Sequence, residues 1–168
     1  MFQTISKIML QGSGNALALL GVVFAVIFPG IGSSQGVGMV GVAGAGLLSE
    51  APDSFGPALI LQALPGTQGI YGLLVGFLIL FSNPMVLGGQ LPISHGLYYF
   101  LSSLPMAVVG YFSALWQARV ALAGMGLLAK QPTEGMKGVI QSGLVETYAV
   151  LALLISVLAI FSVSGIPA

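Results

Sequence analysis

Charged residues divide the chain into long apolar runs. None lies between Lys7 and Glu50, and none lies between Asp53 and Arg119. A helix crosses the hydrocarbon core of a bilayer with about 20 apolar residues, at about 1.5 Å of rise per residue. The first run is long enough for one such helix. The second is long enough for one helix, a break and the start of another.

Three short segments rich in charge, proline or glycine interrupt these runs. They are Glu50-Ala51-Pro52-Asp53, then Ser82-Asn83-Pro84 with Gly88-Gly89-Gln90 and Pro92, and finally Lys130-Gln131-Pro132-Thr133-Glu134. Such residues favour turns over helix interiors. The pattern therefore predicts four helices, near residues 12–48, 54–82, 93–130 and 134–164. The first and third are longer than a bilayer requires, so we expect them to project beyond it at their C-terminal ends.

The composition indicates that most of this chain is embedded in lipid. The chain is 57% hydrophobic and 5% charged, with a mean hydropathy of +1.05, whereas soluble domains carry about 25% charged residues. The formal net charge is zero and no basic patch is present, which excludes a nucleic-acid-binding protein as well as an ordinary soluble enzyme. Without cysteine there are no disulfides and no thiolate metal ligands. We therefore predict an all-α, multi-pass protein of the cell membrane.

Basic residues predict which turns face the cytoplasm. Arg119, Lys130 and Lys137 flank the third turn, while Lys7 alone marks the other side. Because cytoplasmic loops carry an excess of Lys and Arg, we expect the first and third turns in the cytoplasm and both termini outside.

The apolar run after Lys7 shows no small-residue pattern of the kind at which signal peptides are cleaved, so we expect the first helix to be retained.

The sequence aligns with itself when it is shifted by eighty positions. The most informative identities are Gly44 with Gly124, Gly46 with Gly126, Pro52 with Pro132 and Thr67 with Thr147. We infer a duplicated helical hairpin, residues 12–82 and 93–164, with both copies in the same orientation, unlike the inverted repeats of many transporters. The register pairs Glu146 with Gly66, so the chain has one acid where symmetry would allow two.

Glycine is concentrated in the first predicted helix. Gly32 and Gly36 lie four residues apart, as do Gly30, Ser34 and Gly38, and small residues at this spacing allow helices to approach closely in lipid. The pattern favours a helix packed on several sides, as on the inner face of a ring, although an ordinary bundle would use the same residues.

Residues 36–41 also match a dinucleotide-binding fingerprint, but that motif needs a preceding strand and here lies within a membrane span. No phosphate-binding loop of P-loop ATPases occurs in the chain.

Glu146 is the candidate functional residue. It lies nine residues after Lys137, which places it about 13 Å along the helix, close to the middle of a hydrocarbon core of about 30 Å. A charge at that depth costs about 2.5–3.5 kcal/mol on insertion scales. The carboxyl must therefore stay protonated, bind a cation or face water. A carboxyl that only hydrogen-bonds a neighbouring helix is the less favoured interpretation, and we expect an ion site.

Three neutral polar residues are expected in the same layer. Gln117 lies about 20 Å from the end of the third helix, and Thr67 and Gln68 lie a similar distance past the start of the second. Each offers an oxygen, and Pro65 interrupts the helical hydrogen bonding and frees a carbonyl oxygen nearby. One carboxylate with several neutral oxygens suits a hard monovalent cation. Proton transport, by contrast, needs only the carboxyl.

Four strings in the chain resemble one known family. They are residues 58–72, which contain Pro65-Gly66-Thr67-Gln68-Gly69, and residues 103–105, 127–132 and 145–149. From about residue 15 to 162 the chain resembles the rotor-ring proteolipid (c-type or K subunit) of bacterial V-type ATPases, and above all the sodium-translocating members. The resemblance implies a non-catalytic subunit that forms a homo-oligomeric ring, binds one Na⁺ per protomer and carries it as the ring rotates.

The same resemblance implies the site and the partners. The sodium ion would be held by the carboxylate of Glu146, the amide oxygens of Gln68 and Gln117, the hydroxyl of Thr67 and the backbone carbonyl of Leu64, with Tyr71 locking the carboxylate. The implied partners are a stator membrane subunit, a central-stalk subunit seated on the turns near Pro52 and Pro132, and lipid. The chain departs from the family in a longer N-terminal segment and in Trp116 and Arg119 beside Gln117, which bears on the rotor contacts.

Two other functions stay open. In a proton-carrying ring Glu146 would simply be protonated, and Gln68 and Gln117 would only hydrogen-bond its carboxyl. From a different class, the chain could form a passive membrane channel with no ATPase partner. A channel should conduct when reconstituted alone, whereas a rotor protein should not.

Overall fold

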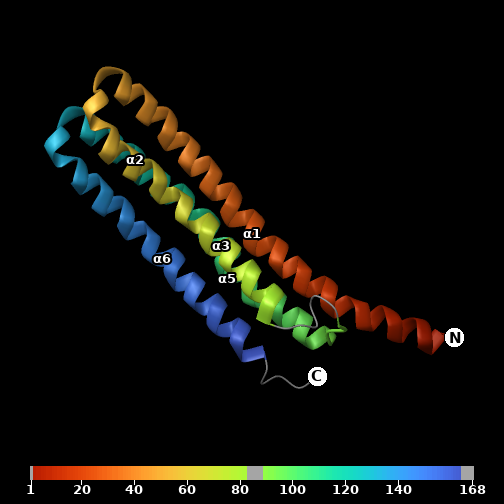
Figure 1. Cartoon of the computed structure of the whole chain (residues 1–168). Coiled ribbons are helices and arrows are strands. Elements are labelled where there is room, and N and C mark those ends of the chain that lie inside the picture. Colours follow the sequence, from red (N-terminus) through yellow and green to blue (C-terminus); the bar gives the residue numbers. More distant parts are fainter. Residues whose placement is uncertain (1, 83–88, 164–168) are drawn as a thin grey trace.

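Four long helical segments lie side by side in the computed structural model, which describes residues 2–82 and 89–163, with side chains from residue 13 onward (Figure 1). In chain order the elements are α1 (Phe2–Glu50), η1 (Pro52–Ser54), α2 (Phe55–Ala63), η2 (Leu64–Gly66), α3 (Thr67–Ser82), α5 (Ile93–Lys130), η3 (Pro132–Glu134) and α6 (Gly135–Ser162). Four stretches are long and apolar enough to cross a membrane, and the described residues contain no strand. This confirms the predicted fold class, an all-α membrane protein with four transmembrane helices.

The observed helices differ from the predicted ranges in two places. The first begins at Phe2 rather than near residue 12, because no proline lies in the preceding turns. The second predicted helix is divided into α2, η2 and α3, since Pro65 lies in a single 3₁₀ turn between the two α-helical parts. The predicted end of the last helix at residue 164, and residues 83–88 of the second break, lie outside the described residues.

The buried face of α1 consists almost entirely of small residues. Its members are Gly14, Ala18, Gly21, Ala25, Pro29, Gly32, Ser33, Gly36, Val40 and Gly44. This face packs against α5: a Cβ added at Gly32 would lie 2.7 Å from the backbone oxygen of Tyr111, and one at Gly36 would lie 3.2 Å from Cβ of Ala118. The glycines therefore set how closely the two backbones approach, as the spacing of small residues in the sequence suggests.

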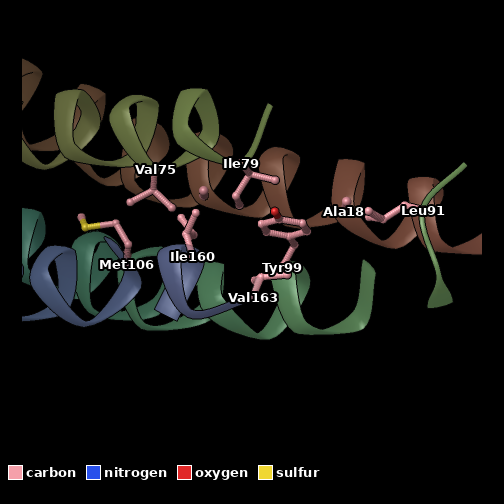
Figure 2. Packing of buried hydrophobic residues seen from close by; sticks show 9 residues of the cluster. Ala18, Val75, Ile79, Leu91, Tyr99, Met106, Ile160 and Val163 are labelled. Atoms are coloured by element: carbon pink, nitrogen blue, oxygen red, sulfur yellow. The ribbon is translucent and has the colours of Figure 1, made fainter. Parts of the chain in front are cut away.

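Two apolar clusters hold the bundle together at different heights. Figure 2 shows the cluster nearer the chain ends, where Val75 and Ile79 of α3 meet Met106 and Tyr99 of α5 and Ile160 of α6. The second cluster lies nearer the turns that follow α1 and α5. It is formed by Val40, Ala58, Leu61, Ala118, Ala121, Met125 and Leu128. Between the two clusters the helices carry the polar residues described below.

The outer surface is apolar and the charges gather at one end. Large apolar side chains such as Ile70, Ile140 and Phe161 are more than half exposed, as expected for helices that face lipid. Most of the charged residues, Glu50, Asp53, Lys130, Glu134 and Lys137, lie at or near the turns that follow α1 and α5. These turns lie at the end of the bundle opposite the start of α1 and the end of α6 (Figure 1).

Candidate ion-binding site

Glu146 lies on α6 and faces α3. It is only partly buried, and its carboxylate accepts a hydrogen bond from the hydroxyl of Tyr71, one of the predicted site residues. Tyr71 lies one helical turn after Thr67 on α3, just beyond the 3₁₀ turn. Tyr71 thus projects from the start of α3 toward α6.

Two glutamine amides form the buried centre of the layer. The side chains of Gln68 and Gln117 are both 0% exposed, and Gln68 Nε2 donates to Gln117 Oε1 over 2.5 Å. The same Gln68 nitrogen lies 3.3 Å from the Ser113 hydroxyl oxygen, which can accept from it. Buried amides are costly unless they are hydrogen-bonded, so this contact between α3 and α5 fixes where both side chains can lie.

Thr67 and Leu64 complete the group on the second span. The Thr67 hydroxyl donates to the Leu64 carbonyl over 3.0 Å, and it lies 3.4 Å from Gln68 Oε1. The backbone N–H of Thr67 closes the 3₁₀ turn on the same Leu64 carbonyl. Pro65 therefore does not leave this oxygen without a partner, because the tighter turn and the threonine side chain both use it.

Two serines that sequence reasoning missed tie this layer to α6. The Ser113 hydroxyl can donate to the carbonyl of Val145, the residue before Glu146, over 3.2 Å. Ser142, which is 0% exposed, donates to the backbone carbonyl of Gln117 over 3.3 Å. Each serine lies four residues before a predicted site residue, and this spacing on one helix face is the signal that could have found them.

The structure brings the predicted residues together in two groups. Gln68, Gln117, Thr67 and Leu64 form one hydrogen-bonded set, while Glu146 is joined to Tyr71. The amides bond to each other rather than to the carboxylate, and Gln117 Nε2 is buried with no hydrogen-bond partner among the described residues. An unpaired buried donor costs about 1–3 kcal/mol, so the Gln117 amide would gain from a rearrangement that gives this nitrogen a partner.

The chemistry of the layer is that of a single negative charge among neutral oxygens. Within the described ranges, no group of three or more His, Cys, Asp or Glu side chains gathers as a metal site. Glu146 also borders a groove of about 410 Å³ on the outward side of α6, together with Gly143, Thr147, Val150 and Leu151. The carboxylate can therefore be reached from the lipid-facing surface of the bundle.

The corresponding position in the first half of the chain carries no such site. When the two halves of the chain are aligned by the shift of eighty positions, Gly66 aligns with Glu146 and Val37 aligns with Gln117. A Cβ added at Gly66 would lie 3.4 Å from the Val37 side chain. A glycine and a valine thus take the places of the acid and the amide in the first copy.

Comparisons with known proteins point to one family. The model of a family described as the C subunit of ATP synthase matches residues 8–79 and 100–159. Over 152 residues the chain is 47% identical to the V-type sodium ATPase subunit K of Enterococcus hirae, a match that covers 90% of this chain and 95% of that protein. Over 147 residues it is 38% identical to the A-type ATP synthase subunit K of Methanocaldococcus jannaschii, covering 88% of this chain and 63% of that protein.

Proposed function

The chain belongs to the family of ATP synthase C subunits, and we propose that it is an ion-carrying rotor protein whose ion binds at Glu146. Family membership confirms the resemblance seen in the sequence. It also makes the chain an integral membrane protein and a non-catalytic part of an ATPase complex. It argues against the passive channel, since the subunit K relatives are named as parts of ATPases.

The observation that carries the proposal is the position of Glu146. It is an acid in the layer between two apolar clusters, it accepts a hydrogen bond from Tyr71, and it borders a groove that opens outward. A carboxylate in a membrane layer is expensive unless it has a task. A site that is partly buried yet open on one side can hold an ion during rotation and exchange it at a stator.

We further propose that the ion is sodium, held by Glu146, Gln68, Gln117, Thr67 and the Leu64 carbonyl. Neutral amide, hydroxyl and carbonyl oxygens are the ligands that hard cations prefer. Thr67 contacts both Leu64 and Gln68, and Gln68 contacts Gln117, so four of the five candidate ligands form one connected group. The sodium specificity in the name of the Enterococcus hirae relative supports the same ion.

Tyr71 has a different proposed role from the five ligands. Its hydroxyl donates to the carboxylate, so it can hold Glu146 turned toward α3 without contacting the ion. Such a hydrogen bond to an ionised acceptor is stronger than one between neutral groups. We therefore assign Tyr71 as the residue that steadies the carboxylate while the ion is bound.

The rest of the proposed cycle depends on partners. Copies of the chain would form a ring, and a stator membrane subunit would present a cation, such as an arginine, at the outward groove beside Glu146. That cation would displace the ion as the ring turns. A central-stalk subunit would seat on the turns near Pro52 and Pro132, where most of the charges gather.

A proton-carrying ring is the second candidate, and one observation favours it. The amides of Gln68 and Gln117 hydrogen-bond to each other rather than to Glu146. The hydrogen bonds from these amides to the carboxyl that were expected of a proton ring are therefore absent, but Glu146 alone, with Tyr71 as its partner, suffices to take up a proton. The choice between the two ions therefore depends on whether the amide oxygens contribute to binding.

Replacing Glu146 tests the proposed function itself. Glu146→Gln keeps the shape and removes the exchangeable charge, so we expect rings that assemble but transport no ion when reconstituted with the ATPase. The matched control is Glu134→Gln, which removes an acid that pairs with Lys137 at the third turn, away from the membrane layer. Transport at a near-parental rate by the pure Glu146 variant would overturn the proposal for either ion.

A further inference from the structure

Ser33 of α1 is a buried serine that the proposed ion site does not use. It is 6% exposed, and its hydroxyl oxygen accepts the backbone N–H of Gly69 on α3 over 2.8 Å. Gly69 directly follows Thr67 and Gln68, which are two of the five proposed sodium ligands. Ser33 therefore holds the backbone of the segment that carries these ligands.

The break in the second span explains why the N–H of Gly69 takes an acceptor from another helix. Pro65 lies in the 3₁₀ turn, and α3 begins after it at Thr67. The first N–H groups of an α-helix have no acceptor within that helix, and Gly69 is the third residue of α3. Within a membrane such a group is costly unless the protein satisfies it. Ser33 supplies the oxygen, as an N-cap side chain does, but from a neighbouring helix.

The contact requires a close approach of α1 and α3. A Cβ added at Gly69 would lie 3.2 Å from Cβ and 3.3 Å from the hydroxyl oxygen of Ser33, and 3.7 Å from Cα of Gly30. A side chain at position 69 would therefore force Ser33 or its helix to shift. Because Gly69 has no side chain, its N–H reaches the serine, and the start of α3 is fixed against α1 beside the proposed ligands.

A second serine holds the same segment from a different helix. A shift of eighty positions pairs Ser33 with Ser113 of α5. Ser113 is also 6% exposed, and its hydroxyl oxygen lies 3.3 Å from Gln68 Nε2, which can donate to it. One serine thus holds the backbone of Gly69, and its counterpart holds the side chain of Gln68. Residues 67–69 lie between two equivalent positions of the repeat.

The two serines bind different groups because only the first hairpin has the break. In the second hairpin α6 runs from Gly135 to Ser162, and Val145 takes the place of Pro65. No helix begins there for Ser113 to cap. Its hydroxyl can donate to the carbonyl of Val145 instead, while its oxygen remains available to the Gln68 amide.

We propose that Ser33 and Ser113 are positioning residues that hold residues 67–69 at two points and thereby set the preference of the site for sodium over potassium. Ser33 does not contact the ion and acts through Gly69 on the two ligands before it. Selectivity between cations depends on cavity size and on how freely the ligands move. A segment held at two points widens less readily around the larger potassium ion. The inference rests on the proposed sodium site, whose ligands it takes as given.

Ser33→Ala tests this role without removing a proposed ligand. The net worth of one such hydrogen bond corresponds to roughly a two- to tenfold change in affinity, so sodium affinity should fall by about that factor. Potassium affinity should fall less, which narrows the preference for sodium. Ser113→Ala should change both affinities in the same direction. Sodium-binding isotherms on purified rings, with displacement of bound sodium by potassium, measure the two effects.

The matched control is Ser156→Ala. Ser156 is 0% exposed and accepts the backbone N–H of Met106 over 3.3 Å. The variant therefore removes the same kind of bond between helices, but beside the apolar cluster that contains Met106 rather than in the ligand layer. Both variants should lower the temperature of thermal unfolding, whereas only Ser33→Ala should change sodium affinity and selectivity.

A pH titration separates positioning of the ligands from damage to the carboxylate. Labelling of Glu146 by a carboxyl-directed carbodiimide without sodium should keep its parental pH dependence in Ser33→Ala, because Glu146 and Tyr71 are unchanged. Parental sodium affinity and selectivity in Ser33→Ala would overturn the inference, as would an equal loss in Ser156→Ala. A parent protein that binds no sodium would instead contradict the proposed sodium site.

Discussion

Removal of the Gln117 amide separates a sodium site from a proton site. Gln117 is 0% exposed, and its Oε1 accepts from Gln68 Nε2, which keeps Ser113 as a second partner in the variant. In Gln117→Ala the sodium ion would lose one charge-assisted oxygen contact. Such a contact is worth about 1.5–3 kcal/mol, which corresponds to roughly a ten- to hundredfold loss of affinity. Proton binding at Glu146 should change far less, because the carboxylate and its Tyr71 partner remain.

The measurement is a sodium-binding isotherm on purified, intact rings of the parent and the variant at one fixed pH. Gln68→Ala should weaken binding by a similar factor, since it removes the other amide oxygen. The matched control is Ser142→Ala, which deletes a buried hydroxyl from the same layer and a hydrogen bond to the Gln117 backbone. It leaves both amide oxygens in place, so its sodium affinity should stay within a few-fold of the parent.

Two results would refute this reasoning. If Gln68→Ala and Gln117→Ala both bind sodium as the parent does, the amides are not ligands and the proton-carrying ring becomes the better account. If Ser142→Ala weakens binding as much as the amide variants, the losses report general loosening of the layer rather than lost ligands.

Two further predictions concern the carboxylate. Tyr71→Phe deletes the hydroxyl that donates to Glu146 without removing an ion ligand, so sodium affinity should fall by less than in either glutamine variant, as the same isotherms will measure. A carboxyl-directed carbodiimide reacts with the protonated acid, so sodium should protect Glu146 from labelling, and more strongly at higher pH, where fewer protons compete. Potassium should protect far less because the larger ion fits poorly, and mass spectrometry of the labelled peptide can follow both ions. Labelling that ignores sodium would favour the proton ring.

The sequence predicted the fold well because lipid imposes simple constraints. Few charges can lie in the hydrocarbon layer, and the breaks at Pro52 and Pro132 are marked by both charge and proline. Depth along a helix follows from a fixed rise per residue. Counting residues from the turns was therefore enough to expect Thr67, Gln68 and Gln117 in one layer, and these side chains do form one hydrogen-bonded group.

The direction in which polar groups point could not be read in the same way. Rotation of each helix about its axis depends on how its neighbours pack, so the roles of Ser113 and Ser142 appeared only in the assembled bundle. Pro65 was expected to free a carbonyl oxygen nearby, and the family resemblance pointed to that of Leu64. The 3₁₀ turn and the Thr67 hydroxyl both bond to it instead, a local solution that the presence of proline alone does not reveal.

The presence of Gly66 and Val37 in place of an acid and an amide in the first copy has a consequence for energy coupling. In the proposed rotor ring each chain would contribute two hairpins but only one acid, so a full turn would carry half as many ions as a ring of the same number of hairpins with an acid in each. The energy of one turn would then be divided among fewer ions. Such a rotor would move fewer ions for each nucleotide hydrolysed, and each ion could be driven against a steeper gradient.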